Sequence, residues 1–310
     1  MAKGMSIHVG VNDTKAAGVS APLQGCDQDA TDMFKLARDR GFVGINGGEP
    51  DLLLKDDATH DAVLGKMRIA AEKLEAGDIF LFTFSGHGTL RGQEDPKEMD
   101  LQDETLVMQD KFLVDNVLRR LIWPKFKAGV RVVMVSDSCH SGGAAMSLMM
   151  RDSEGESSES SNGGSSVATT RNGSDWSPAM DSQTSNVRSR AQGDFRIRTI
   201  SETEAQTHFE LLKEFYAQLR STLPKDPPAV EAEILLLAAC RETEQTKDGV
   251  PNGLFTTELL KVFNSNGSKT YKQLMTEISS NLEAANAKSH PVMMSIPALP
   301  AFSETEAFRI

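Results

Sequence analysis

The sequence predicts an α/β protein whose mostly parallel central sheet has helices on both faces. Three short apolar runs, at residues 6–11, 78–84 and 130–135, have the nearly continuous hydrophobicity of strands that are buried on both sides. A fourth run of this kind, at residues 233–239, comes late in the chain. Helical patterns separate the first three runs, and strands that alternate with helices are typical of βαβ units in an open parallel sheet.

Three helices are expected between these strands. Apolar residues recur at helical spacing over residues 27–40, 59–76 and 113–121. Gly41 is a stop signal after the first segment, and Pro124 ends the third, because proline cannot continue a helix. Each segment therefore fits the helical part of a βαβ unit.

The C-terminal part of the chain adds further helices. Ser201 and Glu204 have the spacing of a capping box, and apolar residues follow in helical register over residues 209–219. Two more helices are expected around residues 256–263 and 271–282.

A serine-rich segment separates the two ordered parts. Between residues 151 and 190, 12 of 40 residues are serine and large apolar residues are almost absent. Such a segment buries too little surface to offset the entropy cost of ordering, so we expect a long disordered linker that interrupts the fold. We divide the chain into a region with the candidate site (1–150), a flexible linker (151–200) and a region that completes the sheet (201–310). Two separate domains are the alternative, although the second part offers only one clear strand.

Composition limits the classes of function. The formal net charge is −11 and the isoelectric point is near 5.1, which argues against a general nucleic-acid binder and suits basic partners. Cys26, Cys139 and Cys240 are too few, and odd in number, for a disulfide framework. The sequence contains no pattern of a signal peptide and no apolar run long enough for a membrane span. We therefore expect a cytoplasmic protein with reduced thiols and no membrane association.

Two short motifs follow buried strands directly. Ser85-Gly86-His87-Gly88 comes after the run at 78–84, and a second motif around Cys139 comes after the run at 130–135. Ligands of open parallel sheets bind beyond the carboxyl ends of the strands. If the two strands are neighbours, His87 and Cys139 emerge side by side at one edge of the sheet.

A cysteine and a histidine in this arrangement can form a nucleophilic pair. The imidazole of His87 can lower the pKa of the Cys139 thiol, and it can later protonate a leaving amine. The glycines allow the substrate to approach the backbone closely. The backbone N–H groups of Gly88 and Cys139 are candidates for an oxyanion hole.

Other interpretations of these residues remain open. A single buried cysteine or histidine is often only structural. A zinc site would need more ligands than the adjacent pair Cys139-His140 offers, so we expect no metal. His140 is a second candidate base, but adjacent residues of an extended segment point to opposite faces, which favours His87.

The two motifs together resemble the paired signatures of metacaspases and of their bacterial relatives, the orthocaspases. The second motif, Asp137-Ser138-Cys139-His140-Ser141-Gly142, is highly specific in combination with the first. Weaker matches lie at residues 23–30, 103–105 and 252–256, so that the resemblance covers roughly residues 5–146 and 230–264. It implies a caspase-hemoglobinase fold, with a large-subunit region before the linker and a small-subunit-like region after it.

The resemblance also implies an activity. It implies a cysteine endopeptidase, a hydrolase that cuts protein or peptide substrates after arginine or lysine. The substrate-binding residues that match the family motif are Cys26, Asp29, Ser85 and Asp137. Two carboxylates in one cleft suit a guanidinium, which binds bidentately. Alternatively, Asp29 only stabilises the N-terminus of a helix.

Calcium is the cofactor that several metacaspases need. Asp103 and Asp115 match part of the family's acidic set, but Asn116 and Met146 stand where other members carry carboxylates. Calcium prefers six to eight oxygen ligands, so we expect no cofactor and calcium independence. The acidic cluster at residues 94–100 is then a solvated loop.

The linker suggests self-processing. Its end holds a group of basic residues, and a protease specific for basic residues could cut after one of them: Arg188, Arg190, Arg196 or Arg198. An activating protease or regulator is a further expected partner, and we expect a monomer. The alternatives from other classes are a catalytically idle caspase-like scaffold in a signalling or defence pathway, and an acyl or amide transferase that uses the same dyad.

Overall fold

A computed structural model gives the fold. It describes residues 2–14, 17–19, 22–91, 103–139, 196–241, 244–265, 267–296 and 300–310. Most of the expected linker, together with His140, Met146 and the acidic cluster at 94–100, lies outside these residues.

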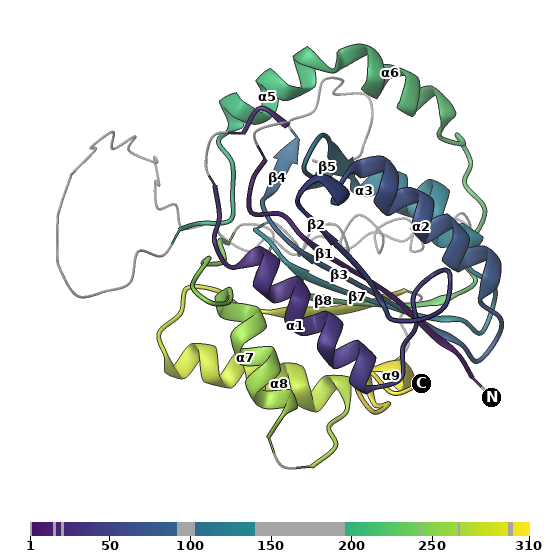
Figure 1. The fold of residues 1–310 in the computed structure, drawn as a ribbon, viewed down its shortest axis with the longest axis vertical. Helices are drawn as coiled ribbons and strands as arrows, with labels where there is room; N and C mark the ends of the chain where they lie inside the picture. Colours follow the sequence, from purple (N-terminus) through teal and green to yellow (C-terminus); the bar gives the residue numbers. More distant parts are fainter. Residues whose placement is uncertain are drawn as a thin grey trace, which may run out of the picture.

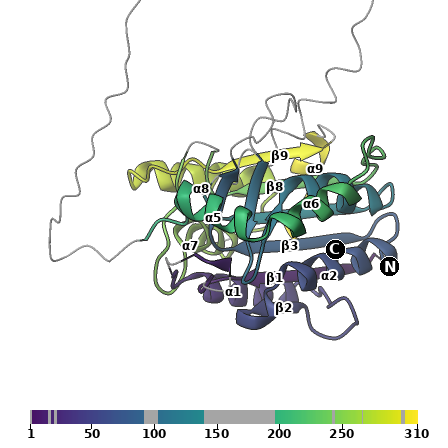
Figure 2. The ribbon, with the colours of Figure 1, turned by 90° about the horizontal axis from the view of Figure 1, so that it is seen from above.

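A six-stranded sheet in the order β2-β1-β3-β7-β8-β9 forms the centre of the molecule. Its first five strands are parallel, and β9 pairs with β8 in the antiparallel direction at one edge, opposite to β2 (Figures 1 and 2). The strands are β1 Gly4–Gly10, β2 Asp51–Leu54, β3 Ile79–Ser85, β7 Arg131–Asp137, β8 Glu233–Ala238 and β9 Val292–Ile296. The four predicted apolar runs are β1, β3, β7 and β8.

Helices cover both faces of the sheet, as predicted. One face carries α1 (Cys26–Asp39), α7 (Leu254–Phe263) and α8 (Tyr271–Ala284), and the short α9 (Pro300–Ser303) packs there as well (Figure 1). The other face carries α2 (His60–Lys73), α5 (Glu202–Leu211) and α6 (Lys213–Thr222). Each face therefore has its own hydrophobic core.

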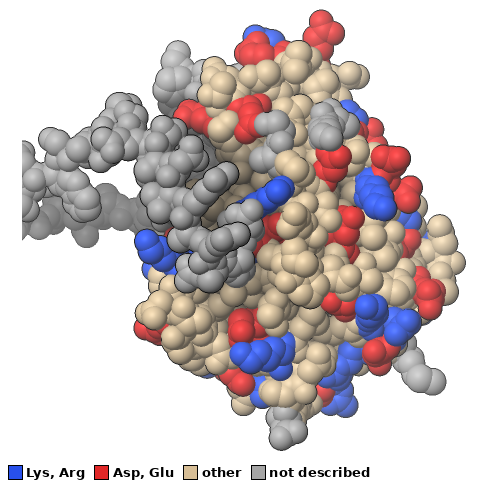
Figure 3. Space-filling view, turned by 60° about the vertical axis from the view of Figure 1, so that its left-hand side comes forward, with Lys and Arg blue, Asp and Glu red and all other residues tan. Residues whose placement is uncertain are grey.

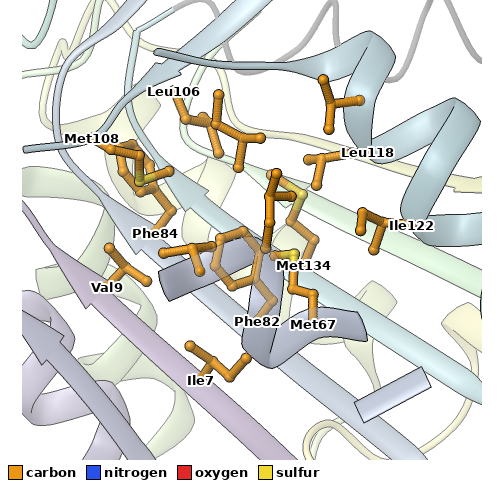
Figure 4. Packing of buried hydrophobic residues seen from close by; sticks show 14 of the residues in the cluster. Ile7, Val9, Met67, Phe82, Phe84, Leu106, Met108, Leu118, Ile122 and Met134 are labelled. Carbon is orange, nitrogen blue, oxygen red and sulfur yellow. The ribbon is translucent and has the colours of Figure 1, made fainter. Parts of the chain in front are cut away.

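The core on the α2 face shows how the strands are held. Met67 of α2 packs with strand residues and with the segment that follows β6 (Phe112–Val114), whose helical turns begin at α3 (Asp115–Val117) (Figure 4). The strand residues in this cluster include Ile7, Val9, Phe82, Phe84 and Met134. Burying one such side chain stabilises the fold by about 1.5–3 kcal/mol, which fixes the positions of the strand ends.

A small antiparallel sheet lies beside the main one. It has the order β4-β5-β6, with β4 Gly88–Arg91, β5 Asp103–Val107 and β6 Phe112–Val114. The sequence pattern predicts that a helix begins at residue 113. This start is wrong, because Leu113 lies in strand β6. The helical turns begin at Asp115, and Leu118–Ile122 forms a π-helical turn.

Two further boundaries differ from the expectation. The helix predicted from Ser201 is two helices, since α5 ends at Leu211 and α6 begins at Lys213. The capping box of Ser201 and Glu204 is present. Residues 196–200, which the sequence analysis placed in the linker, contact the site described below.

The surface carries side chains of both charges. On the face shown in Figure 3, acidic and basic side chains are interspersed over a mostly uncharged surface. Among the described residues, no helix has both the length and the apolar character that a membrane crossing needs.

Candidate active site

The ends of β3 and β7 lie level with each other. Ser85 at the end of β3 pairs with Asp137 at the end of β7, and His87 and Cys139 follow two residues later in each chain segment. A Cβ atom added to Gly88 would lie 3.1 Å from the carbonyl carbon of Cys139 and would overlap its oxygen. The structure therefore brings the backbones after the two strands into contact, and only glycine fits at position 88.

An extended segment of the chain's own sequence lies across this point. The carbonyl oxygen of Arg198 accepts hydrogen bonds from the backbone N–H groups of Gly88 (3.0 Å) and Cys139 (3.4 Å). The N–H of Arg198 donates to the carbonyl of Thr246 (3.2 Å). Thr199 forms a parallel bridge with Gly88. The main chain at residue 198 is thus held on both sides, with its carbonyl directed at two N–H donors.

The side chain of Arg198 fills a buried pocket. Its Nη1 atom donates to Ser85 Oγ (2.8 Å) and to the carbonyl of Asp137 (2.8 Å), and it lies 2.9 Å from Asp137 Oδ1. Its Nη2 atom donates to Asp29 Oδ2 (2.6 Å) and Asp248 Oδ1 (3.0 Å). The side chain has no exposed surface. Three carboxylates therefore surround one guanidinium.

The carboxylates are themselves held in place. Asp29 Oδ1 accepts from the N–H of Gly253 (2.9 Å), and Asp29 Oδ2 accepts from Ser85 Oγ (2.7 Å). Asp137 Oδ2 accepts from the backbone N–H (3.0 Å) and the hydroxyl (2.7 Å) of Thr256 in the first turn of α7. In each carboxylate one oxygen accepts from a backbone N–H, which leaves the other oxygen directed at the guanidinium of Arg198.

The electrostatics of the pocket favour a permanent cation. Burial by itself would lower the pKa of Arg198, but Asp137, Asp29 and Asp248 outweigh it and raise that pKa well above its usual value. Burial raises the pKa of Asp29 to about 6, although Arg198 opposes the shift. Asp29 is therefore ionised at neutral pH and begins to take up a proton just below it.

A family model described as "Caspase domain" matches residues 3–302. The chain belongs to the caspase domain family. Its relatives include Metacaspase-9 of Arabidopsis thaliana, with 28% identity over 87% of this chain and 88% of the relative. Metacaspase-1 of Mycosarcoma maydis is 23% identical over 95% of this chain and 72% of the relative.

A solved structure shares the caspase-like fold. Protein GSU0716 from Geobacter sulfurreducens superposes with a TM-score of 0.73 and 28% identity, over 99% of each chain. The predicted caspase-like α/β fold and the predicted membership among caspase-like cysteine peptidases are thus confirmed. This caspase-family chain is a cysteine-type endopeptidase, and metacaspases are among its relatives.

The thiol of Cys139 is enclosed in this structure. Its Sγ atom accepts a hydrogen bond from the N–H of Thr246 (3.2 Å) and lies 3.6 Å from the carbonyl oxygen of Thr246. Burial raises the pKa of Cys139 to about 12, and the nearby Cys240 adds to the shift. The resting thiol is therefore protonated, and a base is needed to make the thiolate.

The predicted site residues converge on Arg198. Asp29, Ser85 and Asp137 touch its guanidinium, and Gly88 and Cys139 touch its carbonyl. Two further predicted residues are fully buried: Cys26 at the start of α1, and His87, which precedes Gly88 in the chain. Burial raises the pKa of the Cys26 thiol, so that it stays neutral in the pocket.

Sequence reasoning missed four residues of the site. Asp248, Gly253 and Thr256 shape the pocket, and Thr246 binds both Cys139 and the main chain of Arg198. All of them follow β8, more than a hundred residues after Cys139. The only available signal was the weak family match at residues 252–256, which contains Gly253 and Thr256.

Proposed function

We propose that this endopeptidase hydrolyses peptide bonds after arginine, and less readily after lysine, with Cys139 as nucleophile and His87 as general acid and base. The observation that carries the proposal is the carbonyl of Arg198, which accepts from the N–H groups of Gly88 and Cys139 while its side chain fills an acidic pocket. A substrate of a cysteine peptidase occupies its site in this way just before cleavage.

The chemistry follows from these positions. The imidazole of His87 takes the proton of the Cys139 thiol, and the thiolate attacks the carbonyl carbon of the arginine. The negative charge on the carbonyl oxygen is stabilised by the N–H groups of Gly88 and Cys139, and one such donor lowers a barrier by about 3 kcal/mol. His87 then protonates the leaving amine, which leaves a thioester on Cys139. Water, deprotonated by His87, hydrolyses the thioester and restores the thiol.

The same proposal includes self-processing. The bond that lies over the two N–H donors joins Arg198 to Thr199, so the chain cuts itself there into residues 1–198 and 199–310. Of the four arginines named above, Arg188 and Arg190 lie outside the described residues. Arg196 is exposed and donates to the carbonyl of Pro22, away from the pocket. Arg198 alone among the two described candidates has the geometry of a cleaved residue.

Peptide hydrolysis tests the activity. We expect wild-type protein to hydrolyse fluorogenic peptides that end in arginine, and Cys139→Ala and His87→Ala to reduce kcat by about a thousandfold or more. Peptides that end in aspartate or asparagine serve as the control and should remain uncut. Folded wild-type protein that cuts none of these peptides would favour an idle scaffold, and transfer of the acyl group to an added amine in preference to water would favour a transferase.

A further inference from the structure

The pocket contains a carboxylate that neither the motifs nor the family resemblance assigns. We infer that Asp248 is a specificity-determining residue that makes the enzyme prefer arginine to lysine. The inference rests on the proposed function, because it concerns the pocket in which that function places the substrate. It depends on how four residues with acceptor atoms, namely Ser85, Asp137, Asp29 and Asp248, are divided between the two terminal nitrogens of Arg198.

The two nitrogens have different partners. Nη1 faces Ser85 and Asp137, and Nη2 faces Asp29 and Asp248. The Oδ1 atom of Asp248 lies 3.0 Å from Nη2. The side chain of Asp248 is almost fully buried, and the carboxylate therefore interacts with the guanidinium without competition from water.

A lysine side chain cannot use these acceptors equally. Its ammonium is a single point that comes to the position of the arginine Cζ atom, about 1.3 Å short of either terminal nitrogen. Asp137 lies on the Nη1 side of that point, and Asp29 and Asp248 both lie on the Nη2 side. Asp248 is the more distant of the two from Nη2, at 3.0 Å against 2.6 Å for Asp29, so an ammonium loses the contact with Asp248 first. The bond to Asp248 requires the outer nitrogen of a planar fork, so its loss should affect arginine more than lysine.

Asp248 is held in the orientation that this role requires. Its Oδ2 atom accepts from the N–H of Gln24 (2.7 Å), and its Oδ1 atom accepts from the N–H of Gly25 (3.1 Å). Gly25 precedes α1, so the carboxylate also lies at the positive end of that helix. These contacts fix the side chain before any substrate arrives, which lowers the entropy cost of binding.

The backbone of Asp248 contacts the bound segment as well. Its N–H donates to the carbonyl of Arg196 (2.7 Å), two residues before the bond that the enzyme cuts. Asp248 therefore touches the substrate chain at two places. It belongs to the region after the linker, whereas Asp29, Ser85 and Asp137 belong to the region before it. Recognition of arginine thus needs both regions in place.

The test compares two peptides that differ only in arginine or lysine at the cleaved position. Proteins carry Arg198→Ala, so that the chain's own segment does not compete for the pocket. We expect Asp248→Asn to lower kcat/KM about ten- to a hundredfold for the arginine peptide. The factor by which kcat/KM falls for the lysine peptide should be at least about five times smaller, so that the arginine-to-lysine ratio of kcat/KM decreases. Asp39→Asn, which removes an exposed carboxylate at the far end of α1, should leave the ratio unchanged. An unchanged arginine-to-lysine ratio in Asp248→Asn overturns the inference.

A second measurement does not depend on activity. In the Cys139→Ala background, thermal unfolding of Asp248→Asn, Arg198→Ala and the double variant gives their coupling. We expect Asp248→Asn to lower Tm when Arg198 is present, and to lower it less or raise it with Arg198→Ala, because the remaining carboxylates then repel one another. Equal Tm changes in both backgrounds would mean that Asp248 is only structural. If wild-type protein cuts no arginine peptide, the proposed function fails. The Tm coupling still shows in that case whether Asp248 and Arg198 interact, because it does not depend on activity.

Discussion

Gly253 offers a way to close the pocket without disturbing the dyad. A Cβ atom added at this position would lie 2.6 Å from the Cζ atom of Arg198 and closer still to Nη2. The φ angle of Gly253 is −62°, which any residue adopts, so Gly253→Ala adds a methyl group without backbone strain. The methyl group should displace a bound guanidinium by about 1 Å, since carbon atoms in contact stay about 3.5 Å apart.

The cost can be estimated from the bonds that such a displacement breaks. Nη2 donates at 2.6 Å to Asp29 and at 3.0 Å to Asp248, and neither bond survives a shift of this size. A hydrogen bond to a charged group contributes about 1.5–3 kcal/mol, so both together contribute about 3–6 kcal/mol. We therefore expect Gly253→Ala to lower kcat/KM for arginine peptides about a hundredfold to ten-thousandfold.

The assay is steady-state hydrolysis of an arginine peptide, with circular dichroism as the check on folding. Gly65→Ala is a matched control, because it adds the same methyl group in α2, where no atom other than those of its own helix turn and chain neighbours lies within 4 Å. The control should retain wild-type kinetics. Wild-type kcat/KM in a folded Gly253→Ala protein would refute the assignment of this pocket to the substrate arginine.

Two further outcomes follow from the charges in the site. Burial raises the pKa of Asp29 to about 6 while the guanidinium of Arg198, which opposes the shift, is in the pocket. An empty pocket lacks that cation, so its Asp29 takes up a proton, and the pocket loses a negative charge, as the pH falls from neutral towards 6. KM for arginine peptides should rise over that interval, and a KM that is flat, or equally pH-dependent in Asp29→Asn, contradicts this. We also propose that the enzyme is independent of calcium, because Asn116 carries no carboxylate and its Oδ1 atom already accepts a hydrogen bond from Arg119 (2.5 Å). Rates should be equal in EDTA and in millimolar calcium, and a strong activation by calcium would be the contrary result.

The long apolar runs made most of the sheet predictable. β1, β3, β7 and β8 are buried along nearly their whole length, so their sequences carry a continuous signal. β9 is half-buried over most of its residues, and its sequence does not stand out. Strands β2 and β6 have only four and three residues, too few to show a strand periodicity in the sequence, and pairing with neighbouring strands stabilises them. For this reason the helical spacing of Leu113 with later residues wrongly predicts a helix there.

The motif-bearing half of the site was also predictable. Ser85, His87, Asp137 and Cys139 follow two buried strands, and the pairing of parallel neighbours brings such ends together. Asp248 has no comparable signal, because its partner Gly25 lies 223 residues away in the sequence. Contacts of that range depend on the tertiary fold and leave no local periodicity.

The role of Arg198 also depends on the tertiary fold and has no local signal in the sequence. It was one of four basic residues at the end of a serine-rich segment, and no local feature distinguishes it from Arg196. The difference lies in the fold, where Arg198 is fully buried and Arg196 is exposed. Which of the two arginines is the candidate for cleavage depends on whose carbonyl oxygen accepts from the N–H groups of Gly88 and Cys139, and in the structure this is Arg198.

Intact-mass analysis of the purified chain tests the central claim most directly. The account predicts that wild-type protein yields two fragments, residues 1–198 and 199–310, the second with Thr199 at its N-terminus. Cys139→Ala should remain uncut, and Arg198→Ala should remain uncut at this bond, whereas Arg196→Ala should be processed like wild type. A wild-type chain that stays at full length, or a cut at this bond that persists in Cys139→Ala, would contradict the account.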